Sequence, residues 1–351
     1  MAGAGLHRPG AAPSYDPGMT WLVTGGAGYI GGHVVRQLLE GGERVVVLDD
    51  LSSGERSRVP AGVPLLRGST LDRAAVDEAL REHRPTGLLH IAARKAVGES
   101  VERPLEYYRA NLTGLQNVLE SCVEHGVRRV LFSSSAAVYG LPDVDPVTES
   151  TPCAPLSPYG ETKLAGEWLL AAAGRAHGLS TVALRYFNVA GAATPELADL
   201  GRSNLVPMVF EALTAGRRPL VFGTDYPTPD GTCVRDYIHV ADVASAHLAA
   251  LRRLAADPPG ATSLVLNIGR GEGVSVRRML EVIGRTTGYD ATGQDAPRRP
   301  GDAASVVASA ELIERELGWR AEYGIEEMIA SAWQGWCARH PGARREGSKG
   351  S

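Results

Sequence analysis

The chain has 351 residues, of which 44% are hydrophobic, and its formal net charge at pH 7 is −4. This length fits one large α/β domain or two closely joined domains. Acidic and basic residues are interspersed, so no basic stripe indicates a nucleic acid as partner. No apolar run reaches the about 18 residues of a membrane span. The four cysteines and nine histidines lack the spacing of metal ligands, so we expect no metal site.

Strand and helix patterns alternate through the first half of the chain. Short apolar segments predict strands near 20–24, 44–49, 64–67, 87–92, 128–133 and 181–186. Apolar residues at helical spacing predict helices near 29–41, 72–83, 104–125 and 158–177. This alternation is typical of a Rossmann-like, doubly wound parallel sheet of the α/β class. Ligands of such sheets bind at the carboxyl ends of the strands.

A glycine-rich turn follows the first predicted strand and reads Gly25-Gly26-Ala27-Gly28-Tyr29-Ile30-Gly31-Gly32. Gly25 allows the tight turn, Gly28 lets the backbone approach a pyrophosphate, and Gly31 lets the helix pack close to the strand. The N-terminus of the following helix offers free N–H groups to an anion. A strand, a glycine turn and a helix in this order therefore predict a dinucleotide site.

Asp49 and Asp50 end the second predicted strand. An acid about 20 residues after the glycines can bind a ribose 2′-OH. Two adjacent carboxylates would repel a 2′-phosphate, which favours NAD over NADP, although Arg56 nearby keeps NADP open. The alternative for both acids is turn chemistry after a strand.

Tyr159 and Lys163 form a Tyr-x-x-x-Lys pair directly after Pro158, a residue that can start a helix. Residues four apart project from one helix face. A cation beside a phenol favours the phenolate, so we expect a Tyr159 pKa below its usual value and a role as general acid and base. A chance spacing on a solvated helix is the alternative, and the glycine turn makes it the weaker one.

These motifs together resemble the extended short-chain dehydrogenase/reductases, and within them the UDP-glucose 4-epimerases. The resemblance spans about 20–340 and is carried, besides the glycine turn, by the segments 95–100, 133–140, 158–160, 185–188 and 234–240. It implies a UDP-hexose 4-epimerase that interconverts UDP-glucose and UDP-galactose through a 4-keto intermediate with tightly bound NAD.

The same resemblance implies three catalytic residues. Tyr159 takes the proton of the sugar 4-OH while NAD takes the C4 hydride, and the hydride then returns to the other face of the turned 4-keto sugar. Lys163 lowers the pKa of the phenol and holds the nicotinamide ribose. Ser135 hydrogen-bonds the 4-oxygen, its alternative role being a cap of local backbone.

The implied NAD contacts lie mainly after the predicted strands. They are Gly25, Gly28, Tyr29, Ile30, Asp49, Asp50, Leu51, Ser52, Ser53, Gly54, Ser69, Thr70, Ile91, Ala92, Ala93, Lys95, Asn111, Ser133, Tyr159, Lys163, Tyr186 and Phe187. Ser69 stands where the family usually has an Asp near the adenine, and a serine hydroxyl can still hydrogen-bond the adenine amine.

The implied UDP-sugar contacts are Lys95, Ser135, Tyr159, Asn188, Asn204, Leu205, Leu220, Phe222, Arg235, Arg299 and Asp302. Two arginines suit a diphosphate because the guanidinium fork matches phosphate oxygens. The resemblance places Asp302 at the uridine ribose.

The organisation expected from these motifs has four parts: a disordered leader (1–18), an NAD-binding Rossmann domain (19–187), a UDP-sugar-binding lobe (188–340) and a flexible tail (341–351). Part of the lobe, about 233–250, is expected to return to the main domain. The resemblance implies a homodimer through the helices near 104–125 and 158–177. We expect a cytoplasmic protein, since 1–18 lacks the apolar core of a secretory signal.

Two departures from the family bear on the substrate. Arg94 is a second cation beside Lys95 and suggests UDP-glucuronate as an alternative substrate, unless it points to the cofactor phosphates or solvent. Val306 is smaller than the Tyr of some members and leaves room for a 2-N-acetyl group.

Other reactions on this fold remain as alternatives. A nucleotide-sugar dehydratase needs an acid pair where Ala136 and Ala137 stand. A ketoreductase would release its cofactor at each turnover, and an NAD-sensing regulator would lack the Tyr159–Lys163 pair.

Overall fold

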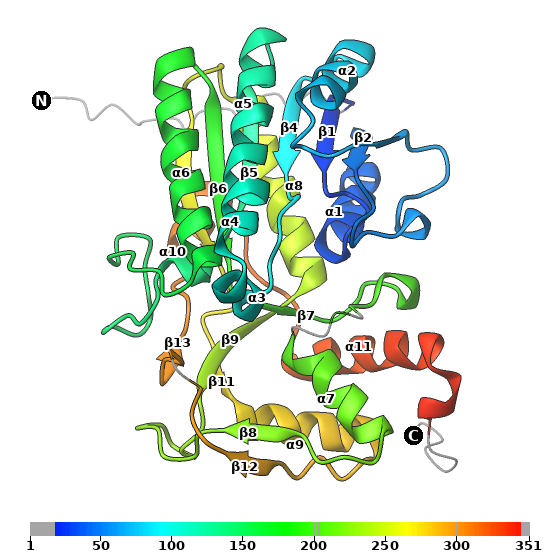
Figure 1. Ribbon diagram of the computed structural model, residues 1–351, viewed down its shortest axis with the longest axis vertical. Coiled ribbons are helices and arrows are strands. Elements are labelled where there is room, and N and C mark those ends of the chain that lie inside the picture. Colours follow the sequence, from blue (N-terminus) through cyan, green and yellow to red (C-terminus); the bar gives the residue numbers. More distant parts are fainter. Residues whose placement is uncertain (1–17, 200, 202–203, 300, 345–351) are drawn as a thin grey trace, which may run out of the picture.

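The computed structural model describes residues 18–199, 201, 204–299 and 301–344. Of the expected leader (1–18), only Gly18 is among the described residues. Of the expected tail (341–351), residues 345–351 lie outside them. The described chain has two parts, a layer of sheet and helices and a smaller lobe beneath it (Figure 1).

Seven parallel strands form the central sheet, in the order β10-β6-β5-β4-β1-β2-β3. They are β1 (Thr20–Thr24), β2 (Arg44–Asp49), β3 (Leu65–Arg67), β4 (Gly87–His90), β5 (Arg129–Ser135), β6 (Ser180–Tyr186) and β10 (Ser263–Ile268). The predicted doubly wound parallel sheet is confirmed. The strand order reverses between β1 and β4, and ligands of such sheets bind at this switch point.

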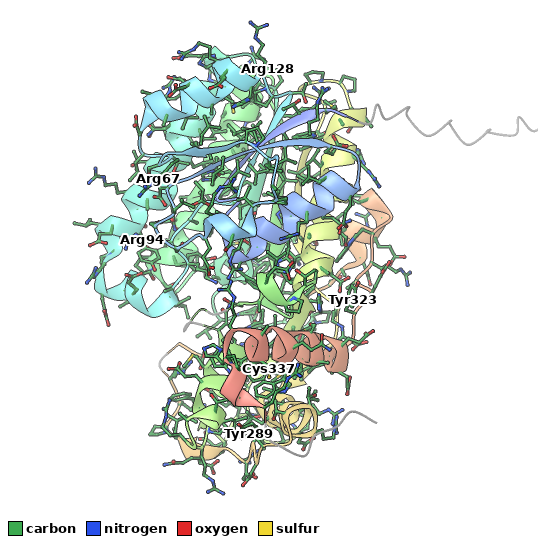
Figure 2. The ribbon with its side chains drawn as sticks, turned by 90° about the vertical axis from the view of Figure 1, so that its right-hand side faces the viewer. Arg67, Arg94, Arg128, Tyr289, Tyr323 and Cys337 are labelled. Carbon is green, nitrogen blue, oxygen red and sulfur yellow. The ribbon has the colours of Figure 1, made fainter. Side chains whose placement is uncertain are left out.

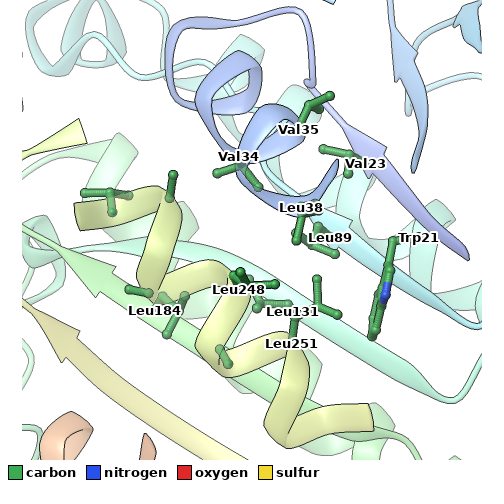
Figure 3. Close-up of a cluster of buried hydrophobic side chains, with 14 of the residues drawn as sticks. Trp21, Val23, Val34, Val35, Leu38, Leu89, Leu131, Leu184, Leu248 and Leu251 are labelled. Carbon is green, nitrogen blue, oxygen red and sulfur yellow. The ribbon is translucent and has the colours of Figure 1, made fainter. Parts of the chain in front are cut away.

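Helices cover both faces of the sheet. They are α1 (Tyr29–Glu40) and α8 (Val240–Ala256) on one face, and α2 (Arg73–His83), α5 (Gly114–Glu124) and α6 (Pro158–His177) on the other. Successive strand residues point to opposite faces, so Trp21 and Val23 pack with α1 and α8 while Leu22 packs with α2 and α5. Figure 3 shows leucines of α8 and valines of α1 meeting on the strands.

The helix predicted over 104–125 is interrupted. After α3 (Val97–Glu102), the chain forms α4 (Pro104–Tyr107), a π-helix over Tyr108–Thr113 (η2), and only then α5. A π-helical turn carries an extra residue and is often found at functional sites. Here it turns Asn111 into the interior, where the side chain is buried.

The lobe contains two small sheets with helices around them. Its strands are β7 (Asn188–Ala190), β8 (Leu220–Phe222), β9 (Val234–His239), β11 (Gly273–Ser275), β12 (Gln294–Ala296) and β13 (Ser305–Val306). Its helices are α7 (Leu205–Thr214), α9 (Val276–Thr287) and α11 (Ile325–Arg339). The helix α10 (Glu311–Leu317) instead packs through Ile313 against the core of the sheet domain, beside α8 and β10. Short 3-10 turns complete the chain at Arg56–Arg58, Ala136–Val138, Pro195–Leu197 and Pro341–Ala343. The core of the lobe is built around Phe210, Met279 and Met328.

The segment expected to return to the main domain, about 233–250, is shared between the two parts of the molecule. β9 pairs with β7, β11 and β13 in the lobe. The chain then packs α8 against α1 and adds β10 to the edge of the central sheet beside β6. The expected flexible tail also differs at its start, because Ala343 is buried and its carbonyl oxygen accepts a hydrogen bond from the Tyr289 hydroxyl at 2.9 Å. Of the helices in the described ranges, none has the length and apolar character to cross a membrane.

The packing of β1 against β4 predicts the cost of a single added methyl group. A Cβ at Gly87 would lie 2.0 Å from Cζ3 of Trp21, which is fully buried. We expect Gly87→Ala to lower the free energy of unfolding by about 1–3 kcal/mol through overpacking, as measured by denaturant titration. Gly342→Ala is the control, because a Cβ there meets no atom within 4 Å. Equal stability of both variants would contradict the packing of Trp21 on β4.

Candidate active site

The glycine turn brings three backbone segments into close contact. Gly25 has φ +76°, and a Cβ there would lie 2.6 Å from the amide nitrogen of Ala92. A Cβ at Gly31 would lie 2.0 Å from the Gly25 carbonyl oxygen. Gly28 precedes α1 without a side-chain cap, and the first turn of α1 has no acidic residue. The helix N-terminus is therefore left for an anion, and this cradle fits the pyrophosphate of a dinucleotide.

Asp49 fastens the glycine turn to the segment after β2. Its Oδ2 accepts the Ala27 amide at 2.9 Å and its Oδ1 accepts the Leu51 amide at 2.9 Å. Burial raises the pKa of Asp49. Asp50 is exposed, and its Oδ1 accepts the Ser52 amide at 2.9 Å. Each carboxylate oxygen has a further lone pair, so a ribose hydroxyl fits beside these bonds.

The other residues expected at the dinucleotide lie along the same edge of the sheet. Ile91, Ala92 and Ala93 follow β4, and the amides of the first two bind the Thr24 carbonyl oxygen at 3.1 and 3.0 Å. The Lys95 ammonium lies 5.9 Å from the ring centroid of Tyr29.

Residues expected near the adenine and the nicotinamide are placed as follows. Ser69 and Thr70 follow β3, and the Ser69 hydroxyl accepts the Leu71 amide at 3.2 Å. Ser53 and Gly54 complete the turn after Asp49. Tyr186 ends β6, and Phe187 packs 6.4 Å from the Tyr139 ring.

The Asn111 side chain hydrogen-bonds to the backbone of Arg94 and to α6. Its Oδ1 accepts the Arg94 amide at 2.8 Å, and its Nδ2 donates to the Arg94 carbonyl oxygen and to Thr162 Oγ1, each at 3.0 Å. The amide therefore ties the segment before Lys95 to α6. This binding of backbone explains why the residue is buried.

The predicted catalytic residues come together where β5 ends and α6 begins. Ser135 ends β5, and Tyr159 lies in the first turn of α6, which the Ser157 hydroxyl caps by accepting the Gly160 amide at 3.2 Å. The Ser135 hydroxyl accepts the Ala137 amide at 3.2 Å, and its proximity lowers the pKa of the Tyr159 phenol. The Lys163 ammonium donates to the Ser133 carbonyl oxygen at 2.8 Å and lies 5.9 Å from the Tyr159 ring centroid.

The expected net lowering of the Tyr159 pKa is wrong for this structure. Burial raises the pKa of Tyr159, and the nearby Ser135 hydroxyl opposes that rise. Burial also lowers the pKa of Lys163 to about 7. The physical reason is that both groups are enclosed, and desolvation disfavours the charged form of each.

Two arginines expected at a diphosphate lie in the lobe, in a group that we call the arginine cluster (Phe222, Arg235, Arg299 and Asp302). Arg235 donates to the Ala303 carbonyl oxygen at 2.8 Å and lies 3.5 Å from the Asp302 carboxylate. The Arg299 guanidinium lies 3.8 Å from the Phe222 ring centroid. A cavity of about 360 Å³ opens beside Asp302 and is bounded by Tyr226 and the segment 141–145.

Four other residues expected at the UDP-sugar lie in β7, β8 and the start of α7. Asn188 is exposed in β7 and stands opposite Tyr237 of β9. Leu220 starts β8 and is exposed. Asn204 precedes Leu205 of α7, and its amide donates to Asp199.

Sequence reasoning missed three polar side chains directly behind the catalytic residues. Glu167 forms a buried ion pair with Arg185, and Ser134 donates to the same carboxylate. The spacing held a signal, because Glu167 stands four residues after Lys163 on α6. Asp236 was also missed, and its carboxylate accepts the amides of Arg270 and Gly271 at 2.9 and 3.0 Å.

The Arg94 side chain is neutralised by neighbouring acids. Its guanidinium lies 2.9 Å from Glu106 and 3.5 Å from Glu99. It is exposed at the outer edge of the short helices α3 and α4 (Figure 2). A cation already paired with two carboxylates is a poor site for a substrate carboxylate, so UDP-glucuronate is not favoured.

Comparison with known proteins agrees with this geometry. The model of the NAD dependent epimerase/dehydratase family matches residues 21–269. The UDP-glucose 4-epimerase of Streptomyces lividans is 44% identical, covering 92% of this chain and 97% of that protein. The UDP-glucose-4-epimerase of Stenotrophomonas maltophila, solved with bound NAD and formylated UDP-arabinopyranose, has a TM-score of 0.87 and 39% identity, covering 92% of this chain and 99% of that one.

A further solved structure is the UDP-Glc/GlcNAc 4-epimerase of Campylobacter jejuni. It has a TM-score of 0.80 and 36% identity, covering 91% of this chain and 100% of that one. Both the family model and these identities extend over most of the chain. The chain therefore belongs to the NAD dependent epimerase/dehydratase family and, within it, to the UDP-glucose 4-epimerase family.

Proposed function

We propose that this protein is an NAD-dependent UDP-hexose 4-epimerase that interconverts UDP-glucose and UDP-galactose. The observation that carries the proposal is the position of Tyr159 and Lys163. They are buried where the glycine cradle and the ends of β5 and β6 meet, and β7 leads directly from there to the lobe with the arginine cluster. The identity with UDP-glucose 4-epimerases over most of the chain supports the same reaction.

The residues of the chain supply binding and proton transfer, while bound NAD supplies a hydride acceptor and donor. Tyr159 accepts the proton of the sugar 4-OH and returns it after the 4-keto sugar has turned over. Ser135 lowers the pKa of the phenol and so supports its ionised form. Lys163 contributes a positive charge near the phenolate, and the enclosed site strengthens that interaction because water is excluded.

The surroundings of Ser135 count against a dehydratase. Removal of the C6 hydroxyl needs an acid pair, and Ala136 and Ala137 follow Ser135 in a 3-10 turn. A ketoreductase differs in a measurable way, because it would consume one reduced cofactor per turnover. Conversion of UDP-galactose to UDP-glucose without added NAD separates these reactions.

The substrate range includes, in our proposal, UDP-N-acetylglucosamine. Val306 stands in β13 opposite Arg235 of β9, next to the arginine cluster. It packs with Tyr139 and Phe187, at the lobe side of the catalytic residues. A valine at this position leaves space that a tyrosine would fill.

A homodimer is the assembly that we propose. Leu105 and Trp168 are 83% and 66% exposed, and both are large apolar side chains. The Tyr108 hydroxyl donates to Glu161 Oε2 at 2.8 Å, which joins η2 to α6. Glu161 and Trp168 are seven residues apart and share one helix face, so these side chains form one surface. A second copy of the chain would cover it as a four-helix bundle.

The division into an NAD-binding domain and a UDP-sugar-binding lobe, and a cytoplasmic location, remain proposals drawn from the sequence. Cofactor and UDP titrations of lobe variants, and cell fractionation, test them.

Tyr159 is the proposed proton carrier. Tyr159→Phe removes one hydroxyl, and we expect kcat to fall by about 10²–10⁴-fold while the protein stays folded and keeps its NAD. Tyr323→Phe is the control, because this tyrosine stacks on His239 outside the site. If Tyr159→Phe had the same kcat as the parent, the proposed mechanism would be wrong.

Another prediction concerns the N-acetyl group. We expect the parent to turn over UDP-N-acetylglucosamine. Val306→Tyr should lower kcat/KM for that substrate at least about tenfold and leave kcat/KM for UDP-glucose unchanged, because the larger side chain excludes the N-acetyl group. Val306→Ala should retain both activities. Parallel kcat/KM assays decide, and a parent without UDP-N-acetylglucosamine turnover contradicts the inference.

A further prediction concerns assembly. Trp168→Glu places a charge in the exposed apolar surface, and we expect a monomer by light scattering where the parent is a dimer, because an unpaired charge is costly to bury. Met208→Glu, on α7 of the lobe, should leave the dimer intact. A parent that is monomeric at micromolar concentration would refute the proposed assembly.

A further inference from the structure

A buried ionic network lies directly behind the catalytic residues. Arg185 donates to Glu167 through Nε and Nη2, at 2.9 and 2.6 Å, which is a two-point pairing of guanidinium and carboxylate. Ser134 Oγ donates to the same carboxylate at 2.5 Å. All three side chains are buried. Their charges therefore act on neighbouring groups more strongly than surface charges would.

The network is joined to Lys163 along two routes. On α6, Glu167 stands four residues after Lys163, so both side chains lie on the same helix face. On β5, Ser134 lies between Ser133, whose carbonyl oxygen holds the Lys163 ammonium, and the catalytic Ser135. Glu167 thus fixes the strand end that binds the ammonium.

Within the described residues, the titratable side chains that act on Tyr159 or Lys163 are Glu167 on α6, His90 on β4 and Tyr186 on β6. Arg185 on β6 pairs with Glu167. Burial lowers the pKa of His90 to about 3 and raises the pKa of Tyr186, so both are neutral near pH 7. From β5, Lys163 meets the ring of Phe132 at 4.9 Å from its centroid. Glu167 is the acid of this set.

We propose that Glu167 is a positioning residue that keeps the Lys163 ammonium charged and thereby sets the upper pH limit of the epimerase reaction. The proposal rests on the proposed function, because it concerns the same proton transfer.

The sign of the effect follows from the charges. Burial lowers the pKa of Lys163 to about 7, and the negative charge of Glu167 opposes this lowering. Lys163 loses its proton as the pH rises through its pKa. Without the carboxylate charge of Glu167, Lys163 loses its proton at lower pH. Above that pH the Tyr159 phenolate has no neighbouring ammonium.

The test is the pH profile of kcat for Glu167→Gln. We expect the alkaline limb to move to lower pH by about one unit, while kcat on the acidic side stays near the parent value. Glu43→Gln is the matched control, because Glu43 is a buried glutamate that accepts a hydrogen bond from Trp21 at the amino end of the sheet. Its profile should coincide with that of the parent.

A loss of kcat by the same factor at every pH would overturn the proposal, because altered strand geometry alone acts alike at all pH values. Ser134→Ala keeps both charges and should leave the limb in place. If Ser134→Ala moved the alkaline limb as far as Glu167→Gln does, the shift would not be an effect of the Glu167 charge.

Glu167→Gln leaves Arg185 unpaired in the interior, which is strongly destabilising. If this variant does not fold, Glu167→Gln/Arg185→Gln replaces it; the limb should then move to lower pH by a smaller amount, because the Arg185 cation that opposes Glu167 is lost as well. If the variant is active and its pH profile of kcat has the same shape as that of the parent, the proposed role of Glu167 is wrong. The proposed function is tested separately, by the Tyr159→Phe assay.

Discussion

The catalytic site depends on one hydrogen bond, from the Lys163 ammonium to the Ser133 carbonyl oxygen. The lysine is 2% exposed, and an ammonium without water is costly unless oxygen atoms replace its hydration. Ser133 offers its carbonyl oxygen because it lies near the carboxyl end of β5, at the edge of the sheet. The same strand end supplies Ser135. A single backbone segment therefore places the cation and the hydroxyl that attend the Tyr159 phenol.

The two parts of the molecule are joined next to the glycine cradle. The Tyr29 hydroxyl, from the first residue of α1, donates to the Gly191 carbonyl oxygen at 2.7 Å. Arg58 is buried and donates to the carbonyl oxygens of Leu197 and Ala198 at 3.0 and 2.9 Å. These bonds cross between the sheet domain and the lobe. Because Tyr29 directly follows the turn that fits the pyrophosphate, the same short segment forms the cradle and holds the lobe.

Local sequence patterns were sufficient for most of the sheet, and they single out the residues to which we assign the chemistry. The glycine turn, the strand ends and the Tyr159–Lys163 spacing are all short-range signals, and the structure brings them to one edge. β10 was missed because its place depends on pairing with β6, and strand pairing is a long-range property. The shape of the helix around Asn111 was missed because its π-helical turn has no short-range signal.

The electrostatics of the site were less predictable than its composition. A cation four residues from a tyrosine predicts a lowered phenol pKa only when its attraction for the phenolate outweighs the cost of burying that charge. Here the fold encloses both, and desolvation is the larger effect. The Glu167–Arg185 pair escaped notice for a related reason, since its partners lie on α6 and β6 and meet only after the sheet has formed.

The late return of the chain to the central sheet has a consequence for biosynthesis. β10 and α8 complete the sheet and cover one face, yet they follow the first segments of the lobe in the chain. A ribosome that has made only the first 187 residues has produced every side chain that we propose to be catalytic, but not α8, which shares with α1 the cover of one face of the sheet. Such a nascent fragment would expose the apolar residues that later meet α8. Maturation of the enzyme is thus tied to synthesis of residues well beyond its catalytic tyrosine.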